Sequence, residues 1–102
     1  MEADSLPNSI EPMKASLAEI PSVSDGWATE IKWDGVRAIS FCEDGELRLQ
    51  GRRLNDITGL FPEIGPLGRQ AAAEGTVLDG EMVAFDEDGI PSFQRIQKRL
   101  RQ

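Results

Sequence analysis

The feature that most restricts the fold is a run of alternating apolar and polar residues from Gly26 to Gly51, interrupted by turn-forming residues. Alternation with a period of two is typical of β-strands that bury one face. The sequence EDGE at 43–46 is a strong signal for a hairpin turn. We therefore predict three consecutive strands, with a hairpin joining the last two; their sequences are GWATEIKWDG, VRAISFC and ELRLQG.

The rest of the chain predicts helices and one further strand. A helix is expected at 62–74, with its first half interrupted by Gly65 and Pro66 and its end at Gly75. A long strand with the sequence TVLDGEMVAFD and a turn at 87–89 come next. These elements place a strand between two helical segments, since a last helix is expected beyond the turn.

That last helix is predicted by its spacing and by its first residue. Ser92 is a typical N-cap, and Phe93, Ile96 and Leu100 recur at helical spacing. The order of strands, helix, strand and helix indicates an α+β fold with a mostly antiparallel sheet and flanking helices. No internal repeat is present.

The front of the chain is predicted to be a lead-in to this domain. Residues 1–12 are polar and contain two prolines, which indicates an irregular segment. Residues 14–19 predict a short helix that Pro21 ends. We therefore place the lead-in at 1–25 and the domain at 26–102.

Composition narrows the possible chemistry. The 102 residues include no histidine and a single cysteine, Cys42. Ser-His triads, His-ligated zinc and an internal disulfide are thereby excluded, and a reducing cytoplasm is the expected location. No apolar run approaches the roughly 20 residues that span a bilayer, so no membrane partner is expected. Catalysis must rely on Lys, Arg, Asp, Glu and a bound ion.

Charge is distributed unevenly along the chain. The net charge is −7, and all 18 acidic residues lie before residue 91. The end of the chain, by contrast, carries Arg95, Lys98, Arg99 and Arg101. Such asymmetry is compatible with a phosphate or nucleic-acid contact and equally with a solvated basic helix.

The first predicted strand carries a lysine between two acids. Strand alternation would place Glu30, Lys32 and Asp34 on one face. The opposite face would pack into the core; it consists of Trp27, Thr29, Ile31 and Trp33. A lysine is a nucleophile only when its amine is neutral, so a site here would need a nearby divalent cation to offset the acids. A salt-bridge ladder across strands is the structural alternative.

The stretch EIKWDGVRA resembles the first motif of the covalent nucleotidyltransferases, which include DNA ligases, RNA ligases and mRNA-capping enzymes. Its core, K-x-D-G, is matched by Lys32, Asp34 and Gly35, and the arginine that often follows is matched by Arg37. Pro12–Met13 resembles the P-M pair that precedes this motif in ligases.

Two further motifs resemble the DNA ligase branch. GRRLNDITGLFPE matches a Ser-Arg motif at Arg52 and the D-x-T and F-P-E that follow it, although Gly51 replaces the serine. VLDGEMVAFD resembles the D-G-E strand and places Asp79 and Glu81 on one face with Val77 and Val83. GIPSFQRIQKR is typical of bacterial and archaeal ATP-dependent DNA ligases, including those of end-joining systems.

The resemblance implies a partial ligase adenylation domain of ATP-grasp-like fold, in an enzyme of DNA repair and recombination. Lys32 would attack the α-phosphate of ATP, and AMP would then pass to a nick in double-stranded DNA. The implied cofactors are ATP and Mg²⁺ or Mn²⁺. The implied site residues are Glu30 at the adenine edge, Asp34 and Gly35 beside the lysine, Arg37 and Arg52 at ribose or phosphate, and Glu81 at the ribose, with Asp34 and Glu81 at the metal.

The resemblance also implies groups that are expected outside these residues. The family's adenine-stacking aromatic, E-G motif, K-x-K strand and oligonucleotide-binding (OB-fold) domain are not found in residues 82–102. We therefore expect a fragment, or one piece of a split or larger polypeptide, whose partners are the remaining half of the adenylation domain and the OB-fold domain. Two alternatives remain open: an RNA-ligase or capping relative, and a non-catalytic domain that binds a nucleotide or a partner.

Overall fold

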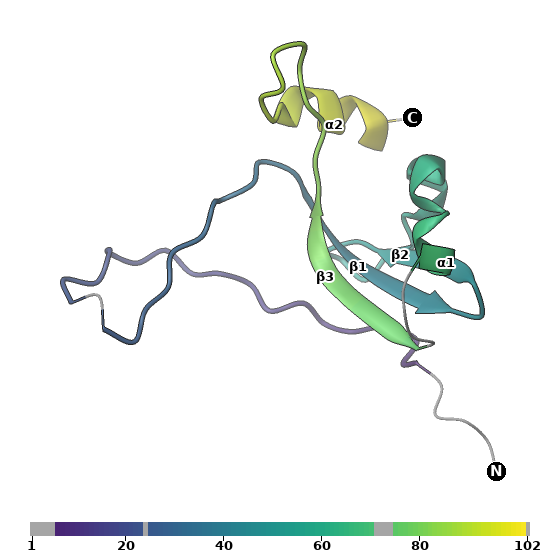
Figure 1. The fold of residues 1–102 in the computed structure, drawn as a ribbon, viewed down its shortest axis with the longest axis horizontal. Coiled ribbons are helices and arrows are strands. Elements are labelled where there is room, and N and C mark those ends of the chain that lie inside the picture. Colours follow the sequence, from purple (N-terminus) through teal and green to yellow (C-terminus); the bar gives the residue numbers. More distant parts are fainter. Residues whose placement is uncertain (1–5, 24, 71–74, 102) are drawn as a thin grey trace.

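A three-stranded antiparallel sheet forms the centre of the molecule (Figure 1). The computed structural model describes residues 6–23, 25–70 and 75–101. The strand order is β2-β1-β3, so the central strand pairs with both others. The elements are β1 (Val36–Glu43), β2 (Glu46–Gln50), the 3₁₀ helices η1 (Thr58–Leu60) and η2 (Pro62–Ile64), α1 (Leu67–Gln70), β3 (Thr76–Met82) and α2 (Phe93–Leu100).

The predicted hairpin at 43–46 is confirmed. Its two central residues, Asp44 and Gly45, have φ angles of 57° and 76°. Two successive positive φ values are typical of the tight turns whose twist matches that of paired strands, and Asp-Gly is a favoured sequence there. The turn therefore sets the register of β1 and β2, with Glu43 opposite Glu46.

The predicted α+β class is also confirmed, with shorter helices than expected. The helix expected at 62–74 is a 3₁₀ turn followed by the four-residue α1, because Gly65 and Pro66 interrupt it; residues 71–74 lie outside the described part. The last helix begins as predicted, and the Ser92 hydroxyl accepts a hydrogen bond from the Arg95 backbone N–H at 3.4 Å. None of the described helices is long and apolar enough to cross a membrane.

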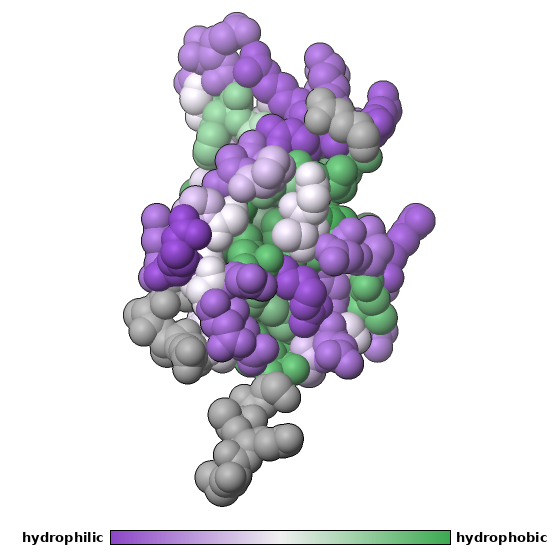
Figure 2. Space-filling model, turned by 90° about the vertical axis from the view of Figure 1, so that its right-hand side faces the viewer, coloured by the Kyte–Doolittle hydropathy of each residue, from purple (hydrophilic) through white to green (hydrophobic). Residues whose placement is uncertain are grey.

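The core lies on one face of the sheet. It joins Ala38 and Leu49 of the strands to Ile57, Phe61 and Ile96 from the segments that cover them. Partly buried residues surround this cluster, and Figure 2 shows apolar residues reaching the surface between polar regions on that side. Of the three apolar residues predicted on the last helix, Ile96 is buried, whereas Phe93 and Leu100 remain substantially exposed.

Two predicted elements are wrong. The chain forms neither a helix at 14–19 nor a strand at 26–35. Both stretches belong to a long irregular excursion, residues 14–23 and 25–35, that projects from the sheet (Figure 1). Trp27 and Ile31, expected in the core, are 69% and 70% exposed, and Trp33 is 44% exposed. A strand requires a hydrogen-bonded neighbour and a short helix requires packing, and this excursion has neither among the described residues.

The other face of the sheet is crossed by an N-terminal strap, residues 6–13. The side-chain amide of the buried Gln50 accepts a hydrogen bond from the N–H of Ile10 at 2.9 Å and donates one to its carbonyl at 2.6 Å. Arg48 stacks over the Phe41 ring and donates to strap carbonyls of Pro7 and Asn8. The strap is irregular, as predicted for residues 1–12, of which residues 1–5 lie outside the described part, and its hydrogen bonds tie it to the sheet.

The lone cysteine provides a test of sheet packing. Cys42 of β1 is 1% exposed, and burial raises the pKa of its thiol above the usual value. The reactive thiolate is therefore scarce at neutral pH, and access is blocked. We expect Cys42 to react with a thiol reagent only after denaturant unfolds the chain, as measured by absorbance at pH 7. Full reaction under native conditions would contradict this packing.

Candidate functional site

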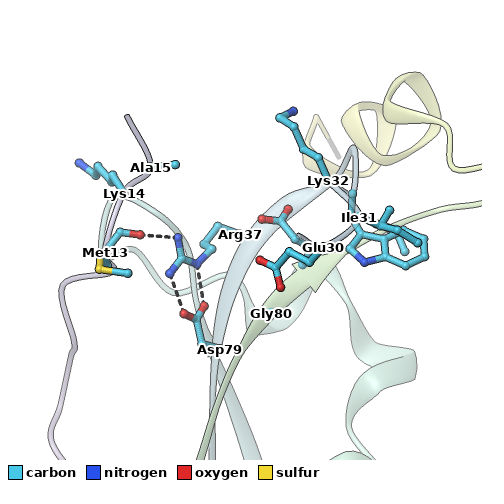
Figure 3. Close-up of a pocket in the computed structure, with 13 residues that line it drawn as sticks. Met13, Lys14, Ala15, Glu30, Ile31, Lys32, Arg37, Asp79 and Gly80 are labelled. Atoms are coloured by element: carbon cyan, nitrogen blue, oxygen red, sulfur yellow. Dashed lines mark hydrogen bonds and ion pairs between the residues drawn. The ribbon is translucent and has the colours of Figure 1, made fainter. Parts of the chain in front are cut away.

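An open pocket of about 980 Å³ lies where the end of the strap, the excursion, β1 and β3 meet. Its volume falls within the range of small-molecule sites. Segments far apart in the sequence contribute to it, as Figure 3 shows. It is lined by Met13, Lys14, Ala15, Glu30, Ile31, Lys32, Trp33, Gly35, Arg37, Asp79, Gly80, Glu81 and Val83.

Gly35 brings the lysine segment against β3. A Cβ atom at this position would collide with the carbonyl oxygen of Met82 and would lie 2.8 Å from Cγ1 of Val83. Backbone atoms cannot move aside as a flexible side chain can, so only glycine fits without displacing one segment from the other. The match at Gly35 therefore has a packing reason that the structure makes explicit.

Lys32 stands at the edge of this pocket with its amine in solvent. Its side chain is 91% exposed, and Nζ lies 3.6 Å from Oδ1 of Asp34. Figure 3 shows the lysine pointing away from the Arg37–Asp79 pair. A loose, exposed ion pair of this kind contributes little stability, which leaves the amine able to reorient towards a ligand.

Arg37 joins three segments of the pocket. Its Nε and Nη2 donate to the two carboxylate oxygens of Asp79 at 2.6 Å each, and its Nη1 donates to the carbonyl oxygen of Met13 at 2.7 Å. The planar guanidinium is suited to such a two-pronged contact. Arg37 therefore ties β1 to β3 and both to the end of the strap.

This pairing predicts an acid-dependent loss of stability. The hydrogen bonds from Arg37 lower the pKa of Asp79 below its usual range. A carboxyl whose pKa is lower in the folded state stabilises the fold above its unfolded pKa, near 3.9, and that contribution is lost as the pH falls through the folded pKa. We expect Asp79→Asn to lower the melting temperature at pH 7 and to leave it less changed at pH 3, as measured by thermal unfolding. An equal effect at both pH values would contradict the ion pair.

The predicted site residues are only partly brought together. Glu30, Lys32, Gly35, Arg37 and Glu81 line the one pocket, with Arg37 directly opposite Glu81 in the β1–β3 register. Of the four residues predicted on one face of the strand, Val77, Asp79 and Glu81 pair with alternate residues of β1, and Val83 follows the end of β3. Asp79, Glu81 and Val83 line the pocket, whereas Val77 does not.

Two predicted site residues lie away from the pocket lining. Asp34 contacts Lys32 but does not line the pocket, and Arg52 lies on an exposed turn after β2. There is little free space beside Gly51, which stands in place of the family's serine. A Cβ at Gly51 would lie 2.7 Å from Oδ1 of Asn55, whose carbonyl oxygen accepts the Gly51 N–H at 2.7 Å.

The pocket lining also contains residues that were not predicted as site residues: Met13, Lys14, Ala15, Ile31, Trp33, Asp79, Gly80 and Val83. The predicted separation of faces is wrong for Ile31 and Trp33, which line the same pocket as Lys32. Met13 ends the strap and Lys14 follows it, and Asp79 was grouped with Glu81 without a partner being assigned. The resemblance of Pro12–Met13 to the P-M pair of ligases could have indicated that Met13 and Lys14 lie near the site. Asp79 could have been recognised because an acidic residue among apolar neighbours usually needs an ion-pair partner.

Metal ligands are sparse at this site. Among residues 6–23, 25–70 and 75–101 no three acidic or cysteine side chains cluster closely enough to hold a metal ion. Magnesium is commonly held by one or two carboxylates together with substrate phosphates and water. The donor set therefore fits an ion that arrives with a phosphate ligand.

The basic end of the chain is partly used within the fold. Arg99 lies 2.8 Å from Glu63, donates to the Leu60 carbonyl at 3.1 Å and faces the Phe61 ring. Arg95 is likewise paired with Glu87 at 2.8 Å. Two of the four basic residues at the end of the chain thus form ion pairs that hold α2 in place. This favours a structural role for them over a nucleic-acid contact.

Comparison with known proteins shows the family of the chain. The sequence model of the ATP dependent DNA ligase domain matches residues 8–102. The chain is 38% identical over 96 residues to the multifunctional non-homologous end joining protein LigD of Mycolicibacterium smegmatis, covering 93% of this chain and 13% of that protein. It is 33% identical over 91 residues to the SPbeta prophage-derived DNA ligase-like protein LigB of Bacillus subtilis, covering 89% of this chain and 33% of that protein.

Solved structures agree with these relatives. Mycobacterial DNA ligase D, solved in complex with ATP and MES, superimposes with a TM-score of 0.63 at 38% identity, over 69% of this chain and 23% of that one. The ligase domain of M. tuberculosis LigD gives a TM-score of 0.62 at 38% identity, over 68% of this chain and 23% of that one. The chain thus spans a small part of each of these relatives. With the family model matching almost its full length, the chain belongs to the ATP-dependent DNA ligase domain family.

Proposed function

We propose that this chain provides the AMP-accepting part of an ATP-dependent DNA ligase that acts in double-strand end joining, with Lys32 as the acceptor. The observation that carries the proposal is the meeting of the K-x-D-G segment and the D-G-E strand in one pocket of nucleotide size. Gly35 permits that meeting by allowing close contact with the end of β3. A solved relative that shares the fold was crystallised with ATP.

The chemistry proposed for Lys32 is a phosphoryl transfer. Its neutral amine attacks the α-phosphorus of ATP, a P–N bond forms, and the P–O bond to pyrophosphate breaks with its electron pair leaving on pyrophosphate. The amine must lose its proton first, and the exposed position of Lys32 lets water accept it. Mg²⁺ or Mn²⁺ bound with the phosphates would offset their charge and favour the neutral amine.

The surrounding residues are given roles that match their positions. Glu30 would accept a hydrogen bond from the adenine edge, and Glu81 would bind a ribose hydroxyl or a metal-bound water. Asp34 would orient the Lys32 amine or a metal ion, since it lies beside that amine. Arg37 would hold the pocket together, because its donors already serve Asp79 and Met13. Arg52 would reach ribose or phosphate only if its exposed turn closes over the ligand.

The partners proposed are the remaining half of the ligase domain, the OB-fold domain and nicked duplex DNA. Exposed side chains of the excursion support the first, because Trp27, Ile31 and Trp33 form apolar surface of a kind that protein contacts usually bury. Sealing would follow when AMP moves to a 5′-phosphate and a 3′-hydroxyl displaces it. The buried, reduced Cys42 supports a cytoplasmic location.

The proposal is tested with a chimera in which residues 8–102, the part that the ligase family model matches, replace the corresponding segment of the M. smegmatis LigD ligase domain. We expect the chimera to seal a nicked duplex with ATP and magnesium, as measured by gel electrophoresis of a labelled strand. The unaltered relative is the positive control. A folded chimera that binds ATP but neither accepts AMP nor seals would favour the alternative, a non-catalytic nucleotide-binding domain.

A further inference from the structure

A second lysine lies at the pocket. The chain has three lysines, and two of them, Lys14 and Lys32, line this pocket, whereas Lys98 lies on α2. Lys14 comes directly after the strap, next to the buried Pro12 and the Met13 carbonyl that Arg37 binds. We propose that Lys14 binds the β- and γ-phosphates of the nucleoside triphosphate whose α-phosphate Lys32 attacks, an inference that rests on the proposed function.

The backbone just before Lys14 is held in place at two points. Ile10 is bound through both its N–H and its carbonyl by the buried Gln50 side chain, and three residues later Arg37 holds the Met13 carbonyl at 2.7 Å. The strap therefore reaches the pocket at a fixed point. A long flexible side chain that starts from a fixed backbone can follow a mobile polyphosphate at low cost.

The charges of the pocket leave Lys14 available. Arg37 is neutralised by Asp79 at 2.6 Å, and Lys32 lies near Asp34. Lys14 forms no ion pair with any acid in the described part of the chain. A bound triphosphate would place several negative charges beside Glu30 and Glu81. An unpaired cation such as Lys14 would offset this repulsion.

The position of Lys14 fits the geometry of the transfer. Figure 3 shows Lys14 and Lys32 on opposite sides of Arg37, with Glu30 on the Lys32 side. In phosphoryl transfer the attacking and leaving groups lie roughly in line on opposite sides of the phosphorus. A nucleophile at Lys32 thus directs the leaving pyrophosphate towards the Lys14 side, where an ammonium would stabilise its growing charge.

The test compares ATP with adenosine as ligands of the full 102-residue chain in magnesium buffer, by titration calorimetry. We expect Lys14→Ala to weaken ATP binding roughly fivefold, the scale of one exposed charge contact, and to leave adenosine binding unchanged. Lys14→Arg should retain most of the ATP affinity. Lys98→Ala removes the same side chain away from the pocket and should change neither affinity.

Each outcome decides between the two proposals. Unchanged ATP affinity in Lys14→Ala, or an equal loss for ATP and adenosine, would overturn the role of Lys14. The proposed function would then still stand if Lys32 of that variant accepts AMP. A folded wild-type chain that binds neither ATP nor adenosine would overturn the phosphate contact of Lys14, and AMP transfer to the chimera would still decide the proposed function. A selective loss of ATP affinity supports the phosphate contact.

Discussion

Replacing Lys32 with arginine is expected to abolish AMP transfer to the chimera, lowering covalent labelling from α-labelled ATP on the order of 1,000-fold or more. Arginine keeps the positive charge and much of the length, but its guanidinium stays protonated and cannot act as a nucleophile. The fold should be unaffected, because the Lys32 side chain is 91% exposed and its contact with Asp34 is loose. Labelling is read by denaturing gel electrophoresis and autoradiography.

The control for Lys32 is a lysine elsewhere in the same chain. Lys98→Arg makes the same substitution on α2, outside the pocket, and should label like the wild type. Melting temperatures of both variants should lie close to that of the wild type, since exposed substitutions usually change stability little. Wild-type labelling in the Lys32 variant would show that another residue accepts AMP.

Replacing Gly35 with alanine is expected to lower AMP transfer roughly 100-fold although Lys32 is unchanged, because small misplacements of a reacting group can have effects of that size. The added methyl group would collide with the Met82 carbonyl and approach Cγ1 of Val83 to 2.8 Å. The lysine segment must then move away from β3, which separates Lys32 from Glu81. The measurement is the initial rate of labelling with saturating ATP.

The matched control for this change is Gly59→Ala. A Cβ at Gly59 meets no atom within 4 Å, and this residue of η1 lies outside the pocket. Its labelling rate should equal that of the wild type. If Gly35→Ala labels as fast as Gly59→Ala, the contact between the lysine segment and β3 has no catalytic importance.

The sheet could be predicted from the sequence where its signals are local. The Asp44–Gly45 turn sets the β1–β2 hairpin by backbone preference alone, and Ser92 starts α2 by capping its first turn. β3 was likewise recognised, although it ends at Met82 and not at the predicted residue 86. The hairpin and α2 depend on contacts between residues close in the chain, and β3 shows the alternation of side chains that is typical of a strand.

The segment around Lys32 could not be predicted in the same way. Its alternation describes which side chains favour a sheet, but a strand forms only if another strand pairs with it. β1 already pairs with β2 and β3, and no further strand adjoins residues 26–34 among the described residues. Trp27 and Ile31 consequently remain exposed where the pattern predicted burial.

The sequence predicted several residues of the candidate site but not the contacts that join its segments. Motif resemblance identified Lys32, Glu30 and Glu81, and the fold brings these three to one pocket. The ion pair between Arg37 and Asp79 depends on the register between β1 and β3. The hydrogen bond from Arg37 to the Met13 carbonyl depends on the path of the strap. Neither can be read from spacing, because both join segments that are distant in the chain.

The most direct test of the central claim is to locate AMP on the protein. The chimera is incubated with ATP and magnesium, digested under conditions that preserve the phosphoramidate bond, and analysed by tandem mass spectrometry. We expect AMP on the peptide that contains Lys32, and none on the peptide that contains Lys14. AMP on any other residue, or a folded chimera that binds ATP and carries no AMP, would contradict it.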